Sequence, residues 1–344
     1  MDQVTELFAY ASRIFEPPTP HVLPEFNFQI AGRKVCLRFA NDYLAEIFSR
    51  AFRHLQVQST SLPDLVVWTL DIKASGLGPP SFAFPDYCSG AFYYPGPPHF
   101  VCDGVTHRID AYDPLRRIGL LCIPELGSLD SGYLAAPFRN IFHWWSCDQG
   151  LLLVHGGAVG TDDGCALLVG RGGSGKSTTV VGCIGSDLRY IGDDYCLIEH
   201  GQPPVVHSLY SSGKADARSR SLLPHLANTF GPTVIDPMGK FIAYLAEHVP
   251  QSLLQSAPLR AVIVPQVGEV DLCEAYPTSS ATALRALAPS TILQFPDSSA
   301  QLLTQMTRLV WDIPCWKLLI GRQPPAAGLV IDKIINSGYL EFAS

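Results

Sequence analysis

The chain has 344 residues, of which 47% are hydrophobic and 16% charged, so it can bury a sizeable core and shows no bias toward disorder. Its formal net charge of −7 argues against general nucleic-acid binding, and its length suggests two domains or one large one. The sequence has no run of about 18 apolar residues, so we expect no membrane span. The acidic N-terminus is unlike a signal peptide, so we expect a cytoplasmic protein.

The ten cysteines form no C-x-x-C pair, and the histidines are not at zinc-finger spacing. Cysteines without such patterns usually serve as small apolar core residues of proteins in a reducing compartment. We therefore expect them to pack in the core and to form neither a disulfide framework nor a structural zinc site.

The first third of the chain reads as a small α+β domain. Residues 1–16 predict a short amphipathic helix, and a hairpin is expected around residues 31–33. Asn41 or Asp42 can cap a helix that runs through Leu55. Strands are expected at residues 64–72 and within 100–122, separated by Gly- and Pro-rich loops over residues 75–100. Residues 1–128 are thus expected to form an N-terminal α+β domain with a role in substrate recognition or assembly.

Residues 129–150 are predicted to form a linking helix. Trp144 and Trp145 lie near its end, and Pro137 interrupts its first half. Aromatic residues at such spacing are more often packing groups than a binding platform, so we expect these tryptophans to be buried.

A phosphate-binding motif follows the linking helix. Residues 166–169 predict a buried strand, residues 170–178 fit the G-x-x-x-x-G-K-[ST] pattern, and residues 179–184 predict a helix. Glycines allow the positive φ values that point successive N–H groups at an anion, whereas the alternative is a Gly-rich turn without function. The residues predicted to hold a nucleotide are Gly170, Gly172, Gly173, Ser174, Gly175, Lys176, Ser177 and Thr178.

Each polar residue at the end of this motif has an expected task. Lys176 can bridge the β- and γ-phosphates, the Ser177 hydroxyl can hold Mg²⁺, and Thr178 can reach the α-phosphate. We therefore predict ATP and Mg²⁺ as ligands, although no residue distinguishes ATP from GTP.

Two carboxylates end the next predicted strand, which spans residues 189–194. A pair such as Asp193 and Asp194 commonly accompanies a phosphate-binding loop: one carboxylate holds Mg²⁺ and the other accepts a proton from an attacking hydroxyl. The alternative is a strand-end turn with exposed acidic residues.

Beyond residue 199 the pattern is less regular. Residues 211–220 form a small basic patch in a predicted polar loop, where Lys214 and Arg218 are candidates for the cation that neutralises a transferring phosphoryl group. The alternative is a solvated loop, and Lys240 is a weaker third candidate. Strands are expected at residues 260–265 and 316–320, and helices at 281–288 and 299–310.

The order of these motifs resembles a known family. His155-Gly-Gly-Ala-Val, the loop at Gly170 and the Gly192-Asp193-Asp194 stretch resemble the HPr serine kinase/phosphorylase family. The Ile-Gly-Asp-Asp stretch also resembles the kinase-2 motif of phosphoenolpyruvate carboxykinases. Segments at residues 209–214, 287–290 and 313–316 resemble the HPr-kinase-related group that includes lasso-peptide precursor kinases.

The resemblance implies a role for five residues. Lys176 matches the phosphate-binding lysine, Ser177 the metal-binding hydroxyl, Asp193 the catalytic base, Asp194 the metal-side carboxylate and His155 an active-site histidine. It implies an α/β, carboxykinase-like P-loop domain with a mixed sheet over residues 151–344, and an assembly as a homo-oligomer. The family's Pro-Gly-Arg-Asn-like and Arg-Gly-Leu-Gly stretches are missing, which argues against HPr itself as the substrate.

The sequence thus predicts an ATP-dependent kinase that phosphorylates a hydroxyl, with Ser or Thr of a peptide or small protein as the expected acceptor. A nucleotide-binding sensor without phosphoryl transfer and a small-molecule kinase remain as alternatives. The identity of the acceptor and the reversibility of the reaction are left open.

Overall fold

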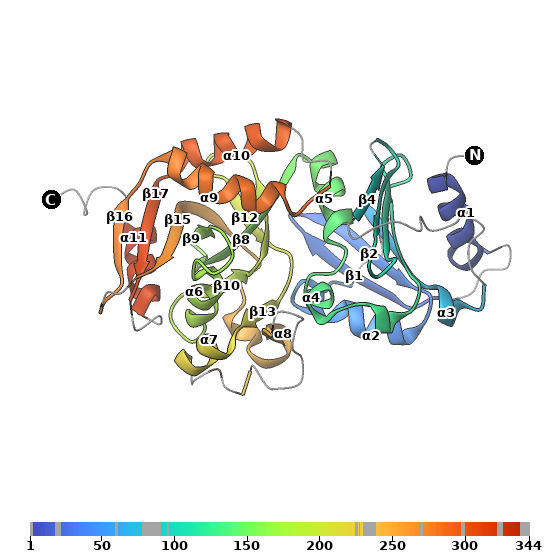
Figure 1. Cartoon of the computed structure of the whole chain (residues 1–344), viewed down its shortest axis with the longest axis horizontal. Coiled ribbons are helices and arrows are strands. Elements are labelled where there is room, and N and C mark those ends of the chain that lie inside the picture. The colour runs from blue at the N-terminus through green and yellow to red at the C-terminus, as the bar shows by residue number, and fades with distance from the viewer. Residues whose placement is uncertain are drawn as a thin grey trace. The chain divides into compact units, whose positions relative to one another are not determined.

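The backbone divides into two units, Met1–Gln149 and Gly150–Ser344, in the computed structural model of the chain (Figure 1). The structure describes residues 3–17, 22–58, 61–77, 91–94, 96–223, 226, 228–229, 239–268, 271–296, 300–321 and 326–337. The region at residues 75–100 predicted as loops lies in part outside the described residues. Each unit combines helices with a mixed β-sheet, so the chain is of the α/β type.

The first unit is built on a seven-stranded mixed sheet with the order β1-β2-β3-β7-β6-β5-β4. Strands β2, β3 and β7 are parallel to one another, and the remaining neighbours are antiparallel. Its strands are β1 (Glu25–Ile30), β2 (Arg33–Phe39), β3 (Leu65–Asp71), β4 (Ala91–Tyr94), β5 (His99–Asp103), β6 (Ile109–Asp113) and β7 (Ile118–Ile123). Its helices are α1 (Gln3–Phe15), α2 (Asp42–Ser49), α3 (Ile72–Ser75), α4 (Ser131–Ala135), α5 (Arg139–Asp148) and the 3₁₀ turns η1 (Arg50–Leu55) and η2 (Leu126–Ser128).

Local signals account for the start of this unit. The hairpin between β1 and β2 turns at Ala31 and Gly32, which both have positive φ (49° and 75°), as a two-residue hairpin turn requires. The side chain of Asn41 accepts a hydrogen bond from the N–H of Leu44 and caps α2. The helix expected through Leu55 ends at residue 49 and continues as the 3₁₀ turn η1.

A single linking helix over residues 129–150 was the wrong expectation. The segment forms two short helices, α4 and α5, both within the first unit, and Phe138 between them adopts a left-handed conformation (φ 60°). Pro137 precedes this break and lacks the N–H that a continuous helix would need. Trp144 and Trp145 are buried, which confirms the prediction that they are packing residues.

A buried polar cluster lies at the centre of the first unit. The carboxylate of Asp110 is fully buried and accepts hydrogen bonds from Arg108 Nε (3.1 Å), the Tyr133 hydroxyl (2.9 Å) and Asn140 Nδ2 (2.8 Å). The Arg108 guanidinium is also buried and has a second carboxylate, that of Asp103, at 4.0 Å. The buried donors of Arg108, Tyr133 and Asn140 thus depend on the Asp110 carboxylate as their shared acceptor.

We expect Asp110→Ala to destabilise the first unit by about 3 kcal/mol, the lower end of the range for breaking a buried ion pair, because Asp103 still faces Arg108. Urea unfolding followed by tryptophan fluorescence measures this change. Glu25→Ala breaks the half-exposed pair with Arg38 and should cost less than about 1 kcal/mol. Equal losses in the two variants would contradict a structural role for the cluster.

The second unit carries the sequence motifs. Its strands are β8 (Leu151–Thr161), β9 (Gly164–Val169), β10 (Arg189–Gly192), β11 (Tyr195–Glu199), β12 (Val205–Ser208), β13 (Ser212–Ala215), β14 (Phe241–Tyr244), β15 (Ser256–Val267), β16 (Glu274–Pro277) and β17 (Cys315–Ile320). Its helices are α6 (Lys176–Gly182), α7 (Ala217–Leu222), α8 (Leu245–His248), α9 (Ser280–Ile292), α10 (Ala300–Asp312), α11 (Ala327–Ser337) and the 3₁₀ turn η4 (Pro250–Ser252).

Strand β9, which leads into the glycine-rich loop, is central in this unit. It pairs with β8 in antiparallel and with β15 in parallel orientation, and β15 pairs in turn with the parallel strand β17. The long strands β8 and β15 also pair at their N-terminal ends with β11 and β12. The sheet is therefore mixed, as the sequence predicted, and β13 and β14 pair with each other in a separate two-stranded sheet.

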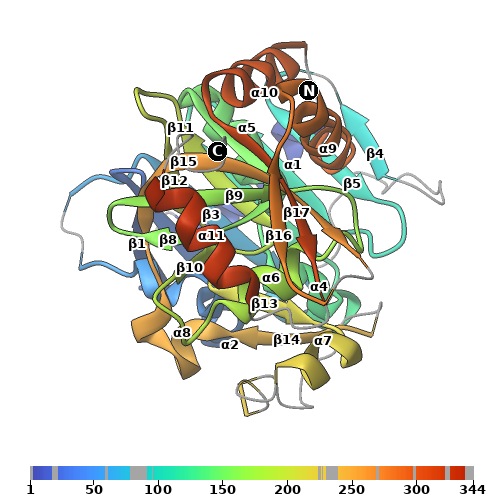
Figure 2. The same ribbon diagram turned by 90° about the vertical axis from the view of Figure 1, so that its left-hand side faces the viewer.

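Helices cover both faces of this sheet. Alternate β9 residues point to opposite faces: Ala166 and Leu168 pack in the core with α6 and α11, whereas Leu167 and Val169 pack in the core with α9 and α10. Figures 1 and 2 show these two pairs of helices on opposite sides of the sheet. A strand buried on both faces explains the continuous apolar run that marks β9 in the sequence.

Most cysteines are core residues, as predicted. Seven of the nine cysteines that the structure describes are buried, and all nine are free thiols. Cys147 is exposed and Cys273 is half-buried. Within the described part of the chain, none of the helices has the length and apolar character needed to cross a membrane.

Candidate active site

The glycine-rich loop, residues 170–175, connects β9 to α6. Gly173 and Gly175 have positive φ values of 77° and 99°, a conformation that residues with a Cβ rarely adopt. A Cβ on Gly175 would also lie 2.4 Å from Ile320 Cδ1, so a larger residue here would force that buried side chain to move. The Ser174 hydroxyl is buried without a hydrogen-bond partner among the described residues. An orphaned polar group in a concave glycine loop is what a bound anion would satisfy.

Lys176 begins α6 and folds back over the loop. Its ammonium donates hydrogen bonds to the carbonyls of Gly170 and Arg171, the second at 3.2 Å. The residue is only 6% exposed. Burial lowers the pKa of Lys176, and the charges of Asp193 and Asp194 oppose this shift. The lysine is thus held by the loop and lies within electrostatic range of both aspartates.

The two aspartates follow β10 directly, at a turn where Asp194 has a positive φ of 68°. Asp193 is 2% exposed, and its carboxylate accepts hydrogen bonds from the backbone N–H groups of Asp194 (3.1 Å) and Lys214 (3.2 Å) and from the Ser177 side chain. Burial raises the pKa of Asp193, and the neighbouring Asp194 charge raises it further. The alternative of a strand-end turn with exposed acidic residues does not describe this pair.

Asp194 has a different set of partners, two basic side chains. Its carboxylate lies 2.7 Å from Lys214 Nζ and 3.8 Å from His155 Nε2. Although burial acts in the other direction, these two groups hold the pKa of Asp194 below its usual value. Asp194 is therefore held as an anion, in contrast to its neighbour Asp193.

Lys214 reaches the site from β13, a strand that the sequence did not reveal. The polar loop expected over residues 211–220 is instead the strand β13, paired with β14, followed by the helix α7. The backbone N–H of Lys214 holds Asp193 and its ammonium holds Asp194, so this residue joins both carboxylates.

The other two cation candidates are placed differently. Arg218 is exposed on α7, and among the described residues it pairs with none of the other predicted site residues. Lys240 lies just before β14, where its charge contributes to the lowered pKa of Lys176.

His155 stands on β8 opposite Tyr195, and their ring centroids are 5.6 Å apart. Its backbone N–H donates to the hydroxyl of Thr291 on α9 at 3.1 Å. Its ring Nδ1 is buried and has no hydrogen-bond partner in the described part of the chain. His155 therefore occupies a position between Asp194 and α9, with one ring nitrogen unused.

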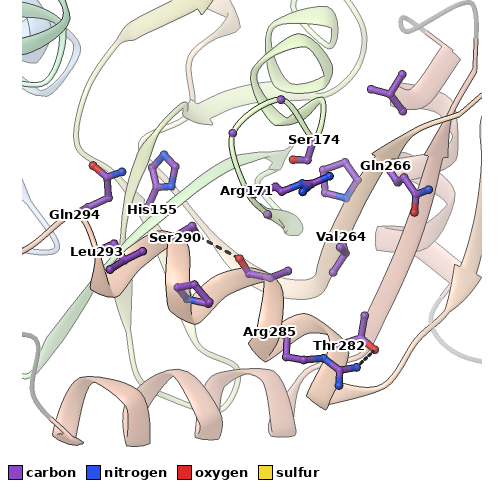
Figure 3. A pocket seen from close by; sticks show the side chains of 17 residues that line it. His155, Arg171, Ser174, Val264, Gln266, Thr282, Arg285, Ser290, Leu293 and Gln294 are labelled. Carbon is purple, nitrogen blue, oxygen red and sulfur yellow. Dashed lines mark hydrogen bonds between the residues drawn. The ribbon is translucent and has the colours of Figure 1, made fainter.

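A cavity of about 770 Å³ opens beside the loop. Figure 3 shows His155 and Gln294 at one end of this cavity, Arg285 and Thr282 at the other, and Arg171 between them. Its walls come from β8, the glycine-rich loop, the end of β15, and α9 with the two residues after it. The lining residues are His155, Gly170, Arg171, Gly172, Gly173, Ser174, Val264, Pro265, Gln266, Val267, Thr282, Arg285, Ala286, Pro289, Ser290, Leu293 and Gln294.

The second unit therefore assembles the loop, Lys176, Ser177, both aspartates, His155 and Lys214 around one point. Thr178 lies half-buried in the first turn of α6, beside Ser177. Sequence reasoning missed Thr291 and Tyr195. Tyr195 had a signal in its position directly after the aspartates, and the α9 side of the cavity had one in the resemblance of residues 287–290, which include Pro289 and Ser290 of the wall.

No protein-family model matches the chain, and no curated protein sequence matches it. Among solved structures, it is similar to the structure of the Hpr(Ser) kinase/phosphatase from Coxiella burnetii, with 11% sequence identity and a TM-score of 0.27. That similarity covers 53% of this chain and 92% of that chain. The functional assignment therefore rests on the contacts of this chain's own residues.

Proposed function

We propose that the second unit is an ATP-dependent kinase that transfers the γ-phosphoryl group to a hydroxyl, with Ser or Thr of a peptide or small protein as acceptor. One observation carries the proposal: a glycine-rich loop with its lysine adjoins a buried Asp193 and a half-buried Asp194, and Lys214 holds the first through its backbone and the second through its side chain. Phosphoryl transfer needs positioning and charge stabilisation, and these groups supply both.

The proposed reaction is an in-line displacement. The acceptor oxygen forms a bond to the γ-phosphorus as the bond from that phosphorus to the β–γ bridging oxygen breaks. ADP leaves with the electron pair of the broken bond, and the hydroxyl proton passes to the carboxylate of Asp193. Lys176 and Lys214 offset the charge of the transferring group, which is the role expected for the loop lysine and for one of the three cation candidates.

The surroundings of the two aspartates support a division of labour. A general base works best with a pKa near the operating pH, and burial raises the pKa of Asp193 in that direction. Asp194 remains an anion beside Lys214 and His155, and this suits a carboxylate that attracts a cation. We therefore assign the role of general base to Asp193 and that of metal ligand to Asp194.

The residues present fit Mg²⁺. Ser177 and the two aspartates offer oxygen donors, and Mg²⁺ usually takes one or two carboxylates together with substrate phosphates and waters. Among the described residues, no group of three or more His, Cys, Asp or Glu could hold a metal by itself, as a transition-metal site would need. Bound Mg²⁺ would supply charge neutralisation at the phosphates, with Ser177 and Asp194 as its protein ligands.

The order of His155, the loop and the aspartate pair is that of the HPr kinase-like proteins, so we extend the proposal to a carboxykinase-like arrangement of the second unit. The missing family stretches favour an acceptor other than HPr. The first unit then has a role in substrate recognition or assembly.

We expect the full chain to transfer label from γ-labelled ATP to a Ser- or Thr-containing peptide in the presence of Mg²⁺. The peptides tested include those encoded beside the gene for this chain. EDTA should abolish the transfer and excess Mg²⁺ should restore it, because phosphoryl transfer needs the cation to neutralise the charge of the phosphates. Nucleotide binding without transfer to any hydroxyl would favour a sensor and contradict a kinase.

A further inference from the structure

The cavity beside the loop has an uneven distribution of charge. Its walls include Arg171 and Arg285 and no Asp or Glu, although the whole chain carries a net charge of −7. Arg285 is exposed and its only described polar contact is a weak one with Thr282 (3.5 Å). No carboxylate among the described residues pairs with either guanidinium. A site of this kind favours an anionic ligand.

The position of the cavity indicates which ligand this is. It touches residues 170–174, at the start of the loop, but neither Ser177 nor Thr178 at the loop's far end. In the proposed kinase, Lys176 reaches the β- and γ-phosphates and Thr178 the α-phosphate, so the start of the loop lies at the γ end. The nucleoside part of a bound ATP would therefore extend from the Thr178 end of the loop, away from this cavity.

One residue of the cavity wall lies close to the aspartate pair. His155 forms part of its wall, and the Nε2 of this residue lies 3.8 Å from Asp194. Figure 3 places His155 and Arg285 at opposite ends, with the loop above and α9 below. A ligand bound along α9 could thus present one end near the aspartates and another to Arg285. The volume of about 770 Å³ is enough for a few amino-acid residues.

We propose that this cavity binds the phosphate acceptor, and that the acceptor is an acidic peptide segment whose Ser or Thr hydroxyl lies at the His155 end while a carboxylate pairs with Arg285. The proposal rests on the kinase function proposed above and adds the class of substrate. Arginine suits this task because its planar guanidinium binds a carboxylate through two hydrogen bonds.

The test uses the full chain, γ-labelled ATP, Mg²⁺ and three synthetic peptide pools with Ser or Thr at a fixed position and acidic, neutral or basic flanks. We expect the acidic pool to be labelled at least about tenfold faster than the basic pool, the usual size of a charge-assisted contact. Arg285→Glu should reverse this preference, and Arg285→Lys should retain its direction. Arg308→Glu, on the exposed surface of α10, is the matched control and should change nothing.

Measurements of nucleotide affinity distinguish a failure of the proposed acceptor site from a failure of the proposed kinase function. A non-hydrolysable ATP analogue with Mg²⁺ should bind Arg285→Glu and the unaltered chain within about twofold, whereas a larger loss would make the cavity a nucleoside site and overturn the proposal. Equal labelling of the three pools, or no labelling of any pool while the analogue binds, would overturn it too. The kinase function itself fails if the unaltered chain does not bind the analogue with Mg²⁺, or hydrolyses ATP at a rate that Asp193→Asn leaves unchanged.

Discussion

Asp193→Asn is expected to lower the rate of γ-phosphoryl transfer by about 10³-fold, within the range for loss of a general base. The amide has nearly the same shape as the carboxylate but cannot accept the proton of the attacking hydroxyl. Nucleotide affinity should stay the same or rise, because the substitution removes one negative charge beside the phosphates. Single-turnover transfer to a labelled peptide, or slow transfer to water, measures the rate.

The fold should survive this substitution. Asparagine loses one of the two backbone hydrogen bonds that Asp193 accepts, from Asp194 and Lys214, but it also relieves the repulsion between the carboxylates of Asp193 and Asp194. Asp187→Asn, at an exposed position shortly before β10, is the matched control and should leave the rate unchanged. A rate for Asp193→Asn within about threefold of the unaltered chain would rule out its role as base.

The parts of the site that could be predicted from the sequence are those whose signal is local. The glycine-rich loop and the aspartate pair each lie within one strand–turn segment, so residue types and spacing reveal them. The buried strand β9 was predicted for the same reason, since a strand covered on both faces is a continuous apolar run. Local signals also gave α1, the β1–β2 hairpin and the Asn41 cap.

The remaining parts depend on pairings between distant residues. Lys214 joins the aspartates because β13 pairs with β14, where Lys214 lies opposite Ile242. A four-residue strand that contains Ser, Gly and Lys has no hydrophobic pattern to distinguish it from a loop. The backbone of His155 is held by Thr291, 136 residues further along the chain. The cavity likewise depends on α9 lying beside the loop, a tertiary arrangement that no single segment encodes.

Lys176→Met is expected to weaken the binding of ATP with Mg²⁺ by about 10²-fold or more. A buried ammonium that reaches two phosphates contributes charge-assisted hydrogen bonds of about 1.5–3 kcal/mol each, and about 3 kcal/mol corresponds to 10²-fold in affinity. The ammonium donates to the carbonyls of Gly170 and Arg171, so it is held at the loop. Isothermal titration calorimetry with a non-hydrolysable analogue measures the loss.

Methionine keeps the length and apolar stem of Lys176, which is 6% exposed, so a large fall in melting temperature is not expected. Burial disfavours the charged form of Lys176, whereas the charges of the two aspartates favour it. Because these effects oppose each other, we expect removal of the charge to change the binding of phosphates more than the stability of the fold. Lys333→Met, on the exposed surface of α11, is the matched control and should bind the analogue normally. If Lys176→Met and Lys333→Met bound the nucleotide equally well, the loop would be a structural turn, and the kinase assignment would lose its phosphate site.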